Sequence, residues 1–121
     1  MSQKIITIYT KEKGCINCTE SEYYNFDLNT ITLHRSDNPA VIWYYNDWTI
    51  DGEMYYINNC KHRIDGPAVI WYHPDGSIWD TRYYINDTCY YKEEYDNLIN
   101  EMKALPKSLK LVHELWWVRE L

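Results

Sequence analysis

The sequence has no excess of positive charge, no long apolar run and too few cysteines for a disulfide scaffold, and each of these features excludes a class of protein. Lys and Arg number 12 against 18 Asp and Glu, a net charge of −6. A protein that neutralises many phosphates usually has the opposite sign, so we expect no long nucleic acid as partner. No apolar run reaches the roughly 18 residues that cross a bilayer, and residues 1–4 lead into a strand-like segment rather than a signal sequence.

Four Cys are too few for the disulfide scaffold of a secreted domain. We therefore expect reduced thiols in a soluble, cytoplasmic protein with no membrane association. A nucleophile elbow, a phosphate loop, an HExxH motif and paired carboxylates are also missing. The sequence predicts a protein that is not an enzyme and needs no cofactor.

Aromatic residues are plentiful but unevenly chosen. One Phe stands against 13 Tyr and six Trp. Tyr and Trp bury a large ring and keep one polar group near water, so they suit thin sheets and binding faces. The length of 121 residues, with 45% apolar and 25% charged side chains, predicts one globular domain over 1–121.

A duplication organises this domain. The segment 34–44 (HRSDNPAVIWY) returns as 62–72 (HRIDGPAVIWY), and 15 of the 28 positions of 34–61 are identical in 62–89. We divide the chain into degenerate leading strands (1–33), repeat 1 (34–61), repeat 2 (62–89) and a helical C-terminal segment (90–121).

Each repeat reads as a β-hairpin. Two runs of β-branched and aromatic residues, 40–44 and 55–57 in the first copy, flank turn residues at 46–47. Upstream, 4–9 and 22–26 read as further strands, and 31–33 completes a leading unit.

Downstream of the repeats, the spacing of apolar residues changes from that of strands to that of a helix. Tyr95, Leu98, Ile99 and Met102 have helical spacing up to Pro106, and a second helix follows, capped by Ser108. We expect a mainly β (α+β) fold, an antiparallel sheet of repeated β-hairpins with two C-terminal helices packed on or capping it. Both strand faces are apolar, so a partner or a second copy should cover what the helices leave open, which favours a homodimer.

The repeated string His-Arg-x-Asp-Gly-Pro-Ala-x-x-x-Tyr, followed by Asp-Gly and Tyr-Tyr-x-Asn, resembles a MORN-like repeat of large DNA viruses and bacteriophages over 34–89. The resemblance implies a β-hairpin repeat sheet, and for authentic MORN repeats it implies association with proteins or membranes.

Four duplicated polar residues are candidate binding groups: His34, Arg35, His62 and Arg63. A single active site needs each role once, whereas a turn needs the same residue in every unit. We therefore favour a structural turn network of each Arg with the Asp two residues on. The alternative is a rim of cationic donors for an anionic small ligand.

Trp43 and Trp71, with Tyr44 and Tyr72, form a second candidate set. They recur two strands apart, hence roughly 9.6 Å from each other at about 4.8 Å per strand. Such a ladder is either core packing or a stacking platform for a base, a peptide or a host protein. Trp117 lies off the apolar stripe of the last helix and is a further candidate contact.

The thiols give a weaker candidate. Cys15 and Cys18 form a CxxC pair that Cys60 and His62 could complete as a tetrahedral zinc site. One CxxC is weak evidence, so ordinary thiols are the favoured interpretation and no metal is assigned.

Two functional hypotheses follow. The first is a viral or phage accessory protein that binds a host protein, in interference with host defence, with the viral context taken from the resemblance alone. The second is a protein that sequesters a small nucleotide, with Trp and Tyr stacking on the base and His-Arg rims holding phosphate.

Overall fold

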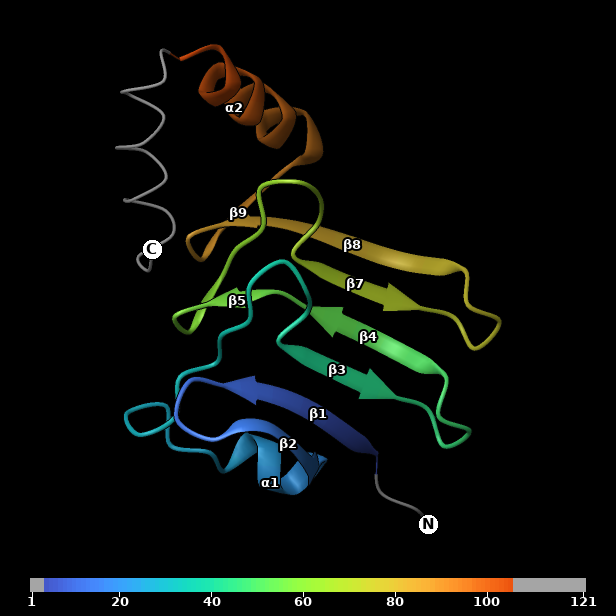
Figure 1. The fold of residues 1–121 in the computed structure, drawn as a ribbon. Coiled ribbons are helices and arrows are strands. Elements are labelled where there is room, and N and C mark those ends of the chain that lie inside the picture. The colour runs from blue at the N-terminus through green and yellow to red at the C-terminus, as the bar shows by residue number, and fades with distance from the viewer. Residues whose placement is uncertain (1–3, 106–121) are drawn as a thin grey trace.

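The computed structural model describes residues 4–105, which form an antiparallel, mainly β structure with two helices (Figure 1). Seven strands make one sheet in the order β2-β1-β3-β4-β7-β8-β9, and β5 and β6 form a separate two-stranded ladder. The elements are β1 Ile5–Thr10, β2 Gly14–Thr19, α1 Glu20–Tyr24, β3 Val41–Tyr44, β4 Ile50–Met54, β5 Tyr56–Ile57, β6 Cys60–Lys61, β7 Val69–Tyr72, β8 Ile78–Ile85, β9 Thr88–Tyr90 and α2 Lys92–Ala104.

The two repeats have the same conformation and lie side by side. Hairpin β3–β4 and hairpin β7–β8 share one register with a bulge before the last pair, and β4 pairs with β7 to join them. A second tight turn closes each unit. Asn58 and Asn59 have φ of 49° and 66°, and Asn86 and Asp87 have 50° and 70°. Positive φ at both central residues suits a two-residue hairpin, and Asn and Asp accept it readily.

The leading segment is a unit with an insertion. The Tyr9 amide donates to the Ala40 carbonyl at 2.8 Å, as the Tyr55 amide donates to the Ala68 carbonyl at 2.7 Å. Strand β1 therefore stands where a preceding repeat would place its second strand. The chain returns through a bridge between Thr10 and Leu33, and β2 and α1 occupy the insertion.

The predicted strand at 22–26 is wrong, because helix α1 covers most of it. Thr19 caps this helix. Its hydroxyl accepts from the Glu22 amide, and the Glu22 carboxylate accepts from the Thr19 amide at 3.0 Å. This capping box overrides the β propensity of Tyr23 and Tyr24.

Two apolar clusters hold the structure. The larger one joins β1, β3 and α1, and its buried members are Ile6, Ile8, Cys18, Leu33, Ala40, Val41, Trp43 and Tyr56. The smaller one joins β8 to α2 through Ile85, Tyr95, Ile99 and Met102. The predicted helix around Tyr95 is confirmed.

Helix α2 lies beyond β8 and β9, at the other end of the sheet from α1 (Figure 1). It therefore caps the array rather than covering a sheet face, as terminal elements of repeat proteins do. The second predicted helix lies outside the described residues. No helix within 4–105 has the length and apolar character needed to cross a membrane.

Candidate functional site

The two histidines brace the tight turns. Nδ1 of His34 accepts from the Asn58 amide at 3.2 Å, and Nδ1 of His62 accepts from the Asn86 amide at 3.0 Å. An imidazole nitrogen that accepts must be unprotonated. Burial lowers the pKa of His62, which is 4% exposed, and this keeps the ring neutral.

The two arginines are equally committed to the fold. Their guanidinium groups donate to the carbonyls of Pro39 and Pro67 at 3.2 and 3.0 Å. Each also stacks on a tyrosine of the neighbouring unit, with Cζ of Arg35 3.8 Å from the Tyr9 ring centre and Cζ of Arg63 4.1 Å from that of Tyr55. Such stacking orients the charge and joins adjacent units.

The surroundings of the His-Arg rim favour a structural role over an anion site. Arg63 also donates to Asp65 at 3.1 Å, which is the turn contact expected from the sequence. The cavity of about 270 Å³ between Arg35 and Arg63 is lined by the carboxylates of Asp37 and Asp65 as well. Because these acids would repel a phosphate, the geometry favours the structural role of the rim.

Trp43 and Trp71 lie closer together than the strand spacing predicts. Their ring centres are 6.0 Å apart and tilted by 55°, which is shorter than the roughly 9.6 Å that two strand spacings give for their backbones. Gly52 lies between them on β4, where a Cβ would come within 2.4 Å of the Trp71 ring. The missing side chain lets Trp71 lean toward Trp43.

Trp43 belongs to the core. It is 5% exposed and meets Tyr23 of α1 edge to face, with ring centres 5.2 Å apart. A ligand cannot stack on a buried indole, so the packing interpretation fits Trp43, while Trp71 is only half-buried.

Tyr44 and Tyr72 lie on the other face of the sheet, because successive side chains alternate. The Tyr72 hydroxyl donates to the Glu53 carboxylate at 2.5 Å. Burial and then this hydrogen bond raise the pKa of Tyr72 to about 12, so the phenol stays neutral. Tyr44 contacts Trp48 with ring centres 5.8 Å apart.

These tyrosines belong to an apolar surface that the sequence did not reveal. We call it the hairpin-end patch, and its members are Tyr44, Trp48, Ile50, Tyr72 and Ile78. Trp48, Ile50 and Ile78 are 66%, 37% and 60% exposed. Ile50 pairs with Tyr44 and Ile78 with Tyr72, and a cavity of about 480 Å³ opens between the two turns.

Trp48 adopts a backbone conformation that disfavours its side chain. Its φ is 70°, and the corresponding residue of repeat 2 is Gly76 with φ of 90°. A left-handed conformation costs a residue other than Gly about 1–2 kcal/mol. Glycine is therefore compatible with this turn, as repeat 2 shows, yet repeat 1 has a large exposed indole at the same position.

The thiols do not gather into a metal site. Cys15 and Cys18 are three residues apart on β2, so their side chains leave opposite faces of the strand, and one is exposed while the other is buried. Within residues 4–105 no three side chains of His, Cys, Asp or Glu lie together as metal ligands would. The weak zinc interpretation with Cys60 and His62 has no geometric support there.

Fold and site together define a mainly β hairpin-repeat protein with an exposed aromatic patch at the turns. No family model, no curated protein and no solved structure matches the chain. The resemblance to MORN-like repeats stays a prediction, and Trp117 lies outside the described residues.

Proposed function

We propose that this chain is a non-catalytic module that binds a protein partner at the hairpin-end patch. Trp48 is the observation that carries the proposal. Trp48 has a left-handed backbone conformation with φ of 70°, and the residue is 66% exposed. The conformational cost is therefore not offset by burial of the indole in the core. Strain of this kind gathers at functional positions, and exposed Trp is the residue most enriched in binding hot spots.

The surroundings of Trp48 define the chemistry of the partner. Asp47 and Asp75 stand in the turns beside the patch. Hydrogen bonds from Thr49 to Asp47 and from Ser77 to Asp75 lower the pKa of both carboxyls, so they are charged at neutral pH. An apolar centre with an acidic rim suits a partner that offers an apolar side chain beside Lys or Arg.

The proposed partner is a host protein, since the repeat resembles those of viral and phage proteins. The proposed location is the cytoplasm. Cys15 and Cys89 are exposed free thiols, which suit a reducing compartment.

A crosslinking experiment tests the proposal. A photoreactive residue replaces Asn46 in the first turn, next to the patch, and a matched control carries it at Glu101 on α2. We expect a defined protein to crosslink from position 46 only, and Trp48→Gly to weaken its affinity by about 30-fold or more, as a hot spot does. Equal crosslinking and affinity in Trp48→Gly would refute a role for the patch.

A further inference from the structure

A cavity between α1 and the β5–β6 turn is lined mainly by aromatic rings. It measures about 350 Å³, and we call it the ring cavity. Four rings line it, two from α1, one from the loop after α1 and one from β5: Tyr23, Tyr24, Phe26 and Tyr56. A concave, mostly apolar site of this size suits a small organic group.

Two of the rings meet at nearly a right angle. The ring centres of Tyr23 and Tyr24 are 5.3 Å apart, and their planes are inclined by 72°. Tyr23 also packs edge to face against Trp43 of the core, with ring centres 5.2 Å apart. Tyr24 is 68% exposed. The two rings therefore form a corner that the core holds in place on one side.

The ring faces of this cavity have no cation of the described chain over them. Elsewhere the fold places a Lys or Arg over the ring of a tyrosine, in the pairs Arg35–Tyr9, Arg63–Tyr55, Lys61–Tyr84 and Lys92–Tyr83. Within residues 4–105, none of these contacts involves a ring of the ring cavity. Because the face of an aromatic ring is electronegative, it attracts a cation. The ring cavity therefore offers faces that a cationic ligand can use.

One carboxylate and one ammonium group also line the ring cavity. Oδ1 of Asp87 accepts from the Lys61 amide at 2.7 Å, which holds the carboxylate beside the cavity. The ammonium of Lys61 lies 5.1 Å from the ring centre of Tyr84. The side chain of Asn59 is taken up by backbone groups of the 28–33 loop. The charge best placed to act on a ligand is thus negative.

The carboxylate occurs in one repeat only. Asp87 corresponds to Asn59 of repeat 1, and both have the left-handed backbone of the tight turn, with φ of 70° and 66°. Asn therefore satisfies this turn, and the turn itself does not require a negative charge. Both side chains line the ring cavity, but only Asp87 brings charge to it.

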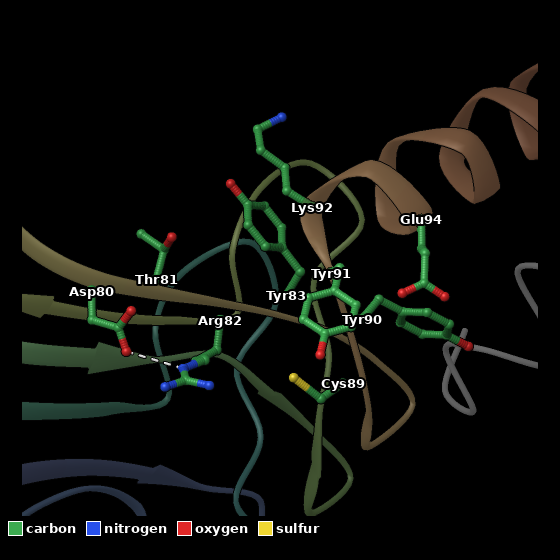
Figure 2. Close-up of a pocket in the computed structure, with 9 residues that line it drawn as sticks. All are labelled: Asp80, Thr81, Arg82, Tyr83, Cys89, Tyr90, Tyr91, Lys92 and Glu94. Carbon is green, nitrogen blue, oxygen red and sulfur yellow. Dashed lines mark hydrogen bonds and ion pairs between the residues drawn. The ribbon is translucent and has the colours of Figure 1, made fainter.

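A second, larger cavity differs in its charges. It measures about 650 Å³ between β8 and the start of α2, and Figure 2 shows that acidic and basic groups line it together. Arg82 donates to Asp80 at 3.0 Å, and Lys92 donates to Asp96 at 2.6 Å. Its cations are therefore paired within the chain, and its exposed Tyr91 supplies a control position.

We propose that the ring cavity binds a methylated ammonium group, such as that of choline or trimethyllysine. The rings attract the charge and contact the methyl groups, and the Asp87 carboxylate adds a further attraction. A primary ammonium brings three donors that need acceptors, whereas a trimethylammonium brings none. The net charge of −6 also favours a cation.

This site is separate from the proposed protein-binding surface. The β5–β6 turn lies at the opposite ends of the strands from the turns of the hairpin-end patch (Figure 1). The two sites share no lining residue. The proposal for the ring cavity therefore stands independently of the proposed function.

Two probes of the same shape test the role of charge. One is choline, and the other is its neutral analogue, in which a tert-butyl group replaces the trimethylammonium. Each is titrated into the full chain and followed through the amide chemical shifts. We expect choline to bind about tenfold more tightly or better, with the largest shifts at 23–28, 56–61 and 87. Equal affinities, no binding of choline, or shifts confined to other segments would overturn the proposal.

Substitutions in the walls test the contacts one at a time. Tyr24→Ala should weaken choline binding about tenfold and Tyr24→Phe should preserve it, because only the ring is needed. Tyr91→Ala at the larger cavity is the matched control. Wild-type affinity in Tyr24→Ala, or an equal loss in Tyr91→Ala, would contradict the site.

The charges give a second series of variants. Asp87→Asn installs the residue of repeat 1, so it keeps the turn and the acceptor for the Lys61 amide. We expect it to weaken choline binding about threefold and to leave the neutral analogue unchanged. Lys61→Gln removes a like charge and should strengthen choline binding. Changes of the opposite sign would refute a cation site.

The source of the cation follows from two larger ligands. Glycerophosphocholine presents the group as a lipid headgroup does, and trimethyllysine presents it as a modified protein side chain does. Tighter binding of one of them than of choline identifies that source. Weaker binding of both assigns the ring cavity to a small free cation.

Discussion

The duplication gives each residue of strands β3, β4, β7 and β8 a counterpart in a second environment. His34 and His62 make equivalent hydrogen bonds in the two copies, and so do Arg35 and Arg63, which favours a structural role for these residues. Trp48 and Gly76 share a backbone conformation but not a side chain. Where the two copies share a backbone conformation but differ in side chain, the fold does not explain the difference. Such a residue is more informative about function than one that both copies share.

This comparison also shows what the sequence could not predict at the residue scale. Attention to shared residues pointed to Trp43, which is buried, and passed over Trp48, whose copy is a glycine. The Trp43–Trp71 distance depends on Gly52, a residue with no counterpart in repeat 2, where Asp80 replaces it. The spacing of strands does not show where a missing side chain, such as that of Gly52, lets two rings approach each other.

Gly52→Ala tests the close approach of Trp71. The new Cβ would lie 2.4 Å from the ring, so the indole must move, and we expect the free energy of unfolding to fall by about 1–3 kcal/mol. Chemical denaturation measures the loss. In a Trp71→Ala background the same change should cost much less, and an equal cost in both backgrounds would contradict the contact.

At the scale of elements, period and turn chemistry predicted the antiparallel sheet and α2, while β propensity misassigned α1. The signal for α1 was present as Thr19 followed by Glu22, a capping box ahead of two tyrosines. The prediction that 55–57 forms the second strand of the first hairpin is wrong, because β3 pairs with β4 at Ile50–Met54. The separate β5–β6 ladder was not predicted either. In this ladder Tyr56 pairs with Lys61 and Ile57 with Cys60.

The tight turn of repeat 2 should make stability depend on pH through His62. The pKa of this buried imidazole lies below its ordinary value of 6.5, so below pH 6.5 the unfolded chain binds a proton before the folded one does. The free energy of unfolding should therefore fall as pH falls from 7.5 to 5.5. The loss is about 1.4 kcal/mol for every pH unit in which only the unfolded state holds the proton.

Replacement by a residue that does not titrate isolates this effect. His62→Asn keeps a side-chain acceptor for the Asn86 amide and removes the proton. Denaturation curves across the same pH range should show a smaller slope than the wild type. Identical slopes would mean that His62 does not control the dependence.

At the scale of the whole molecule, the chain is a short repeat array with different ends. Among residues 4–105 the main contacts of each unit are with its neighbours in the array, and α1 lies at one end and α2 at the other (Figure 1). The sequence predicted helical capping from the change of period near residue 92. It could not show where α2 lies relative to β8 and β9, because that depends on where Tyr95 attaches to the preceding loop.

Tyr95→Phe should loosen one end of the molecule only. The variant loses the hydrogen bonds of the hydroxyl with the Arg63 carbonyl and with Gly66, at 2.6 to 3.3 Å, and we expect a cost of about 1–2 kcal/mol. Hydrogen exchange should accelerate in α2 and in 62–68 but not in β1 or β3. Tyr91→Phe at an 83% exposed position is the control, and uniform acceleration would contradict local attachment.

The measurement that tests the account most directly is the free energy of unfolding of Trp48→Gly and Trp48→Ala beside the wild type. If the indole serves binding rather than the fold, the Gly variant keeps the wild-type value to within about 1 kcal/mol, because relief at φ of 70° offsets the lost ring contact. The Ala variant keeps the backbone cost and should be about 1 kcal/mol less stable than the Gly variant. A loss in the Gly variant of about 3 kcal/mol or more, as for a core tryptophan, would show that Trp48 supports the fold and would contradict the central claim.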